Sequence, residues 1–170
     1  MRYAGIEYND VVNGQGVCVS LFVQGCPHHC EGCFNPETWD FNGGQEVEDT
    51  EFKGHIVQAL CANGVQRNFS VLGGEPLCSE NLPLVNEVIT AVRVAYPNIL
   101  IHLWTGYTLK ELKKLSKKEP LISSILEKIN FLIDGPYVEE KKDLTLMWRG
   151  SSNQCIYRNI NGKFKKVNNI

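Results

Sequence analysis

An alternation of short apolar runs with amphipathic segments is the feature that most constrains the fold of this chain. Short apolar runs predict buried strands, and apolar residues that recur every three or four positions predict helices. The expected elements are strand 17–24, helix 50–62, strand 69–72, helix 81–96, strand 99–104, helices 108–117 and 121–128, and strand 131–133. Asp49 and Thr50 are placed to cap the helix over 50–62.

Strand–helix alternation is typical of a parallel sheet whose strands are joined by right-handed crossovers. A closed eight-fold barrel takes about 250 residues. Because this chain has 170 residues, we expect an α/β fold that forms an open, partial barrel of mostly parallel strands with outer helices.

Polar and glycine residues follow each of the four expected strands, as Gly25-Cys26, Gly73-Gly74-Glu75, Thr105-Gly106 and Asp134-Gly135. In parallel α/β folds, the loops at the carboxyl ends of the strands build the active site. We therefore expect these four loops to form one site.

Composition limits the function classes that are open to the chain. Hydrophobic residues make up 43% of it and its net charge is −2, which does not favour nucleic acid or an anionic membrane as a partner. No apolar run approaches the roughly 20 residues that span a bilayer, and the first ten residues lack the apolar region of a signal peptide. We expect one domain over residues 1–170, located in the cytoplasm.

Three cysteines, Cys26, Cys30 and Cys33, form a C-x3-C-x2-C triplet directly after the first expected strand. In a cytosolic protein, clustered cysteines are more often metal ligands than disulfides. Structural zinc takes four protein ligands, so three thiolates favour an iron–sulfur cubane with one open iron. A zinc knuckle remains an alternative if another cysteine, His28 or His29 supplies a fourth ligand, and a redox or coincidental triplet is a further one.

The GGEP segment, Gly73 to Pro76, follows an apolar strand. Glycines there allow a ligand to approach the backbone, and Glu75 and nearby carbonyl groups are suited to an ammonium group. The alternative is an ordinary tight turn before the next helix.

Other candidate residues lie near the cysteines or at the ends of strands. Asn35 is suited to bind a carboxylate or a ribose, or else to cap a turn before Pro36, and Phe34 is suited to wall off a cluster or a nucleobase, or else to pack. His28 and His29 are expected to be solvated. Asp134 is a candidate to bind a cation or substrate, or to cap a turn.

Four motifs together resemble a known family. They are GCPHHCEGCFNPETWD (25–40), GGEP (73–76), DGPY (134–137) and WRGSSNQ (148–154). The cysteine triplet with GGEP resembles the radical S-adenosylmethionine (SAM) enzymes. The full set, which spans nearly the whole chain, is similar to the family that activates the anaerobic ribonucleoside-triphosphate reductase. Many radical SAM enzymes carry an aromatic residue directly before the third cysteine, whereas this chain has Gly32 there and Phe34 after it.

The resemblance implies a radical SAM domain with its cluster loop at 26–33, in which Cys26, Cys30 and Cys33 hold a [4Fe–4S] cluster. S-adenosylmethionine would chelate the open iron and contact Gly32, Cys33, Phe34, Asn35, Gly73, Gly74 and Glu75. Electron transfer from the cluster would release a 5′-deoxyadenosyl radical that takes hydrogen from a glycine of the large reductase subunit. The implied electron donor is a protein such as flavodoxin or ferredoxin.

Two other functions remain open at this point. One is activation of a different glycyl-radical enzyme, such as formate lyase. Only the WRGSSNQ segment favours the reductase over such an enzyme. The other is a small iron–sulfur or zinc protein for electron transfer or interaction, which would not cleave S-adenosylmethionine.

Overall fold

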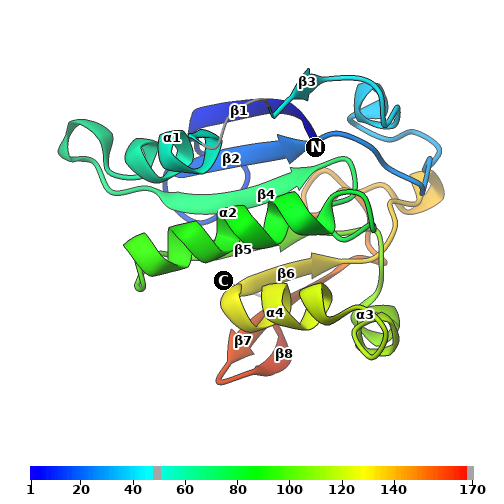
Figure 1. Cartoon of the computed structure of the whole chain (residues 1–170). Coiled ribbons are helices and arrows are strands. Elements are labelled where there is room, and N and C mark those ends of the chain that lie inside the picture. Colours follow the sequence, from blue (N-terminus) through cyan, green and yellow to red (C-terminus); the bar gives the residue numbers. More distant parts are fainter. Residues whose placement is uncertain (48–50, 168–170) are drawn as a thin grey trace.

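A single mixed sheet organises the fold in the computed structural model, which describes residues 1–47 and 51–167. Its eight strands within that part of the chain run in the order β3-β1-β2-β4-β5-β6-β7-β8 (Figure 1). Their bounds are β1 Arg2–Asp10, β2 Cys18–Val23, β3 Gln45–Glu46, β4 Asn68–Gly73, β5 Ile101–Trp104, β6 Phe131–Asp134, β7 Cys155–Ile160 and β8 Lys163–Val167.

The four expected strands are present as β2, β4, β5 and β6, and they lie side by side in parallel. The expectation of mostly parallel strands is wrong, because the β1–β2, β1–β3, β6–β7 and β7–β8 pairings are antiparallel. These pairings lack the crossover helix that a parallel connection needs. The hairpin of β7 and β8 turns at Asn161 and Gly162, whose φ angles of 53° and 80° suit a tight two-residue turn.

The helices follow the expected segments closely. They are α1 Phe52–Ala59, α2 Leu82–Ala95, α3 Leu109–Leu115 and α4 Pro120–Lys128, with short 3-10 turns at Pro36–Thr38, Ala62–Gly64 and Glu139–Lys141. Helix α3 begins with a capping box in which Thr108 and Glu111 exchange side-chain and backbone hydrogen bonds. Asp49 and Thr50, expected to cap the first helix, lie outside the described residues.

Helices α1, α2 and α4 cover one face of the sheet (Figure 1). Alternate strand residues such as Leu21, Val71 and Leu103 are fully buried against this layer, because side chains of a strand point to opposite faces in turn. On the other face, Phe131, Ile133 and Ile156 form a smaller cluster with Trp148. Burying each large aliphatic side chain stabilises the fold by about 1.5–3 kcal/mol, so the parallel strands form a firm base for their loops.

The carboxyl ends of β2, β4, β5 and β6 lie at the same edge of the sheet. The loops that leave them are therefore brought together there. None of the helices in the described part of the chain is long and apolar enough to cross a lipid bilayer.

Candidate functional site

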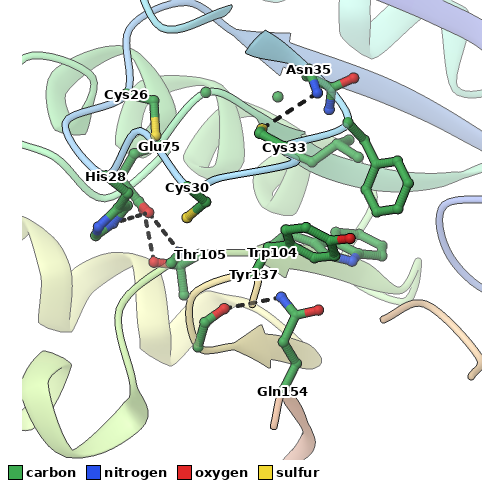
Figure 2. Close-up of a pocket in the computed structure, with 16 residues that line it drawn as sticks. Cys26, His28, Cys30, Cys33, Asn35, Glu75, Trp104, Thr105, Tyr137 and Gln154 are labelled. Carbon is green, nitrogen blue, oxygen red and sulfur yellow. Dashed lines mark hydrogen bonds and ion pairs between the residues drawn. The ribbon is translucent and has the colours of Figure 1, made fainter. Parts of the chain in front are cut away.

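A pocket opens at the carboxyl edge of the parallel strands (Figure 2). It is lined by Cys26, His28, Cys30, Cys33, Phe34, Asn35, Leu72, Gly73, Gly74, Glu75, Trp104, Thr105, Gly106, Gly135, Tyr137 and Gln154. The loops after β2, β4, β5 and β6 all contribute to this list. The expectation that four separate loops build one site is thus confirmed.

The loop that carries the cysteines is held at its base by backbone hydrogen bonds. Gly25 N–H donates to Thr38 O at 2.8 Å, and Cys26 N–H donates to Trp39 O at 3.2 Å. Farther along, Gly32 adopts a φ of +69°, which glycine reaches without steric cost. The turn between Cys30 and Cys33 therefore favours a glycine.

The three thiols of the triplet are partly buried around the pocket. Burial raises the pKa of Cys26 to about 11 and also raises the pKa of Cys30, so a cationic centre would be needed to favour thiolates there. Among the described residues, no three His, Cys, Asp or Glu side chains are close enough to bind a single metal ion. Three soft donors spread around a pocket fit an iron–sulfur cluster, in which each thiolate binds a different iron.

Glu75 is fully buried and accepts four hydrogen bonds. Its Oε1 accepts from Leu77 N–H and from the Thr105 hydroxyl, both at 2.8 Å. Its Oε2 accepts from Gly106 N–H at 2.7 Å and pairs with His28 Nε2 at 2.9 Å. The carboxylate thus joins the loops that follow β2, β4 and β5 (Figure 2).

Gly73 and Gly74 lie where the loop after β4 passes the end of β2. A Cβ at Gly73 would lie 2.8 Å from Phe22 Cα, and one at Gly74 would collide with the carbonyl oxygen of Gly25. Close approach of two backbones therefore accounts for both glycines. This packing gives both glycines a structural role other than the tight turn that was considered. Both residues also line the pocket, and their role in binding a ligand stays a prediction.

Phe34 and Asn35 directly follow Cys33 in the chain and line the pocket with it. Asn35 occupies the N-cap position of the 3-10 turn at Pro36–Thr38, but its side chain makes no capping hydrogen bond. Phe34 is 54% exposed, and its ring centroid lies 5.1 Å from that of Tyr137. The local capping role considered for Asn35 is therefore not seen, and Phe34 stands at the mouth of the pocket.

Asp134 is buried but is not among the pocket residues. Its Oδ2 accepts a hydrogen bond from Leu109 N–H, in the first turn of α3, at 2.6 Å. Burial raises the pKa of this carboxyl. Asp134 thus holds the first turn of α3, which is 25 residues away in the chain, rather than the turn that follows it. Its suggested role with a cation or substrate stays a prediction.

The WRGSSNQ segment folds back onto the loop after β6. Gln154 Nε2 donates to Gly135 O at 2.9 Å, and its Oε1 accepts from Gly150 N–H at 2.9 Å. Asn153 donates to Pro136 O at 2.8 Å, and Trp104 donates to Trp148 O at 2.8 Å. Gln154 is the residue of this segment that lines the pocket.

Comparisons with known proteins match nearly the whole chain. Residues 12–157 match the model of a family described as a 4Fe-4S single cluster domain. The chain is 39% identical over 159 residues to the anaerobic ribonucleoside-triphosphate reductase-activating protein of Pasteurella multocida (strain Pm70). This match covers 93% of this chain and 98% of that relative. Proteins of the same name from Escherichia coli (strain K12) and Enterobacteria phage T4 are 38% and 34% identical, over 92% and 97% of this chain and 98% and 99% of their own.

The chain belongs to the family of anaerobic ribonucleoside-triphosphate reductase-activating proteins. The resemblance inferred from the motifs is thus confirmed. Among the residues that it implied for the site, the structure brings together Cys26, Cys30, Cys33, Phe34, Asn35, Gly73, Gly74 and Glu75 around the pocket. Gly32 is not a lining residue and serves the turn between two cysteines.

Sequence reasoning missed His28, which was expected to be solvated. Its side chain is only 20% exposed and faces Glu75, and its ring meets that of Tyr107 edge-on at 4.6 Å. Its position two residues after Cys26 indicated that it lies near the site. Its partner lies 47 residues away, which no local pattern predicts.

Proposed function

We propose that this protein is a radical SAM enzyme that installs a glycyl radical on the anaerobic ribonucleoside-triphosphate reductase. The observation that carries the proposal is the meeting of three cysteine thiols with the loops of four parallel strands at one pocket, in a chain whose relatives are named as activating proteins of that reductase. Those names favour this function over a formate-lyase activator and over a small electron-transfer or zinc protein.

Different residues of the pocket are proposed to bind the cluster and S-adenosylmethionine. Cys26, Cys30 and Cys33 hold a [4Fe–4S] cluster, which when bound supplies the electron for cleavage of S-adenosylmethionine and so gives access to radical chemistry. The segment Gly73–Glu75 would bind the amino end of S-adenosylmethionine through its backbone, and Phe34 and Asn35 would contact the rest of the molecule. Gly32 acts by allowing the turn that sets the spacing of Cys30 and Cys33.

The proposal includes a single radical SAM domain over residues 1–170, with its cluster loop at 26–33. In this proposal β2, β4, β5 and β6 with their helices form the open, partial barrel of that fold, and the antiparallel strands extend it on both sides. An unsealed barrel leaves room for a segment of a protein substrate at its mouth.

The partners follow from the reaction. The large subunit of the reductase provides the glycine, and a protein such as flavodoxin or ferredoxin provides the electron. A cytoplasmic location keeps the seven cysteines reduced and able to bind iron.

Anaerobic reconstitution tests the cluster on which this function depends. We expect about four irons and four sulfides per chain, with release of 5′-deoxyadenosine after reduction and addition of S-adenosylmethionine. Cys26→Ala, Cys30→Ala and Cys33→Ala should each abolish both. The matched controls Cys61→Ala and Cys155→Ala should retain them, since neither residue lines the pocket. Stoichiometric zinc without iron–sulfur absorption would contradict the proposal.

A further inference from the structure

Glu75 is the point at which three loops of the site are joined. The Leu77 amide belongs to its own loop after β4, the Thr105 hydroxyl and the Gly106 amide belong to the loop after β5, and His28 belongs to the cysteine loop. Glu75 N–H also donates to Gly25 O at 2.8 Å. The side chain and the backbone amide of Glu75 thus both form hydrogen bonds with neighbouring loops.

The acceptor capacity of the Glu75 carboxylate is fully used. An ionised carboxylate offers about four lone-pair positions, and here each oxygen has two partners at 2.7–2.9 Å. A ligand's ammonium group would have to displace one of these donors. Displacement would leave a buried donor without a partner, which is costly.

His28 is held in the orientation that this pairing requires. Its ring packs edge-on against Tyr107, and it lies so close to Gly106 that a Cβ there would collide with the ring. Gly106 therefore admits His28 to the carboxylate and donates its own amide to the same oxygen. The neighbouring His29 points elsewhere, with its ring 4.9 Å from that of Trp39.

We propose that His28 is a positioning residue that clamps the cysteine loop to the loops after β4 and β5 through Glu75, and that the Glu75 side chain serves this clamp rather than binding a ligand. The function of the clamp, to fix Cys26, Cys30 and Cys33 over the pocket, rests on the proposed function. Its existence does not, because the contacts are all within the chain. Hydrogen bonds to a charged acceptor are stronger than neutral ones, which suits a clamp made of few contacts.

Hydrogen exchange in the metal-free protein tests the clamp directly. His28→Asn shortens the side chain so that its amide no longer reaches Glu75. We expect exchange at the Gly106 amide and in the 26–35 loop to become about tenfold faster or more, with β4 unchanged. His28→Gln should restore slow exchange, because its terminal amide can take the place of Nε2. His29→Asn is the matched control, since asparagine tolerates the positive φ of 47° at that position.

A second readout uses the reconstituted protein. His28→Asn should lose iron to a chelator about tenfold faster than the wild type, and His28→Gln should not. Glu75→Gln should show the same exchange and iron loss as His28→Asn, and the double variant should add little, because both residues act in one unit. If Glu75 instead bound the ligand, Glu75→Gln would weaken S-adenosylmethionine binding and leave exchange in the metal-free protein at the wild-type rate.

The outcomes separate the two proposals. Equal exchange in His28→Asn, His28→Gln and wild type would overturn the clamp while leaving the radical function intact. Failure of the wild type to form a cluster would overturn the proposed function, and the exchange rates of the metal-free protein would still decide the clamp.

Discussion

His102 shows how a titratable side chain is kept neutral on the face of the sheet away from the helices. Its ring stacks on Phe131 at 5.2 Å, its Nε2 lies 3.2 Å from Gln15 N–H, and its Nδ1 lies 3.3 Å from Phe69 O. These partners suit a neutral ring that accepts at Nε2 and donates at Nδ1. Burial lowers the pKa of His102 to about 4.

This depressed pKa predicts a specific loss of stability in mild acid. The unfolded chain binds a proton at His102 below about pH 6.5, whereas the folded chain does so only near pH 4. Stability is therefore full above pH 6.5 and falls as the pH drops toward 4. Between pH 7 and pH 5 the free energy of unfolding should fall by about 2 kcal/mol more in wild type than in His102→Gln. Urea unfolding of the metal-free proteins measures this, and equal pH slopes would contradict it.

At the scale of single residues, the sequence predicted that the three cysteines of the triplet meet Phe34, Asn35 and Gly73–Glu75, and all of these residues line one pocket. Ligand spacing is local, so C-x3-C-x2-C is visible in a short window. The pairing of His28 with Glu75 depends on the register of β2 with β4 and on the loop after β5, and so it emerged only from the fold. The same applies to Gln154, whose contacts with Gly135 join distant parts of the chain.

Among the elements, the loop after β4 packs closely against the residues at and just after the end of β2. Gly74 N–H donates to Val23 O at 2.9 Å, and a side chain at Gly74 would meet the backbone of Gly25. Backbone atoms cannot rotate away as a side chain can. The cysteine loop and GGEP therefore depend on each other for their positions.

Gly74→Ala should destabilise the protein by about 1–3 kcal/mol, because the added Cβ forces the two backbones apart. Gly54 provides the matched control: it lies exposed in α1 with nothing within 4 Å of the position of a Cβ. Gly54→Ala should stabilise the protein by about 0.5–1 kcal/mol. Urea unfolding of the metal-free variants measures both changes. A Gly74→Ala variant as stable as wild type would show that the two backbones can separate at little cost.

The central elements were predictable from sequence. A strand buried on both faces is a run of apolar residues, and a helix buried on one face has apolar residues every three or four positions. Strands β2, β4, β5 and β6 and all four described helices were found in this way. Strands β1, β3, β7 and β8 were missed, since they are shorter or more polar and carry weaker patterns. The Asn161-Gly162 pair was a usable signal for the β7–β8 hairpin. A hairpin is antiparallel, so recognising it would have lowered the number of parallel strands expected.

At the scale of the whole molecule, the candidate site continues into a second groove. The groove shares Phe34, Asn35, Leu72, Trp104, Tyr137 and Gln154 with the first pocket and extends to Val12 and Leu144. Val12 and Leu144 are 71% and 73% exposed. Exposed apolar side chains that gather beside a site can form a surface that binds a protein, and the reductase named in the relatives is the candidate partner.

The double variant Val12→Ser with Leu144→Ser should bind the reductase about tenfold more weakly, because apolar contact at the edge of the groove is lost. Val94→Ser is the matched control, since Val94 is 78% exposed but lies on α2, on the helical face. Calorimetry or a pull-down titration with purified reductase measures the affinity. Equal affinities of the double variant and the wild type would place the docking surface elsewhere.

Electron paramagnetic resonance of the reductase after activation tests the central claim most directly. Reduced, reconstituted protein is mixed without oxygen with S-adenosylmethionine and the reductase, and a parallel sample contains Cys30→Ala. We predict a glycyl radical on the reductase with the wild-type protein and none with the variant. Cleavage of S-adenosylmethionine without a radical on the reductase, or a radical only on a formate-lyase-type enzyme, would contradict the account.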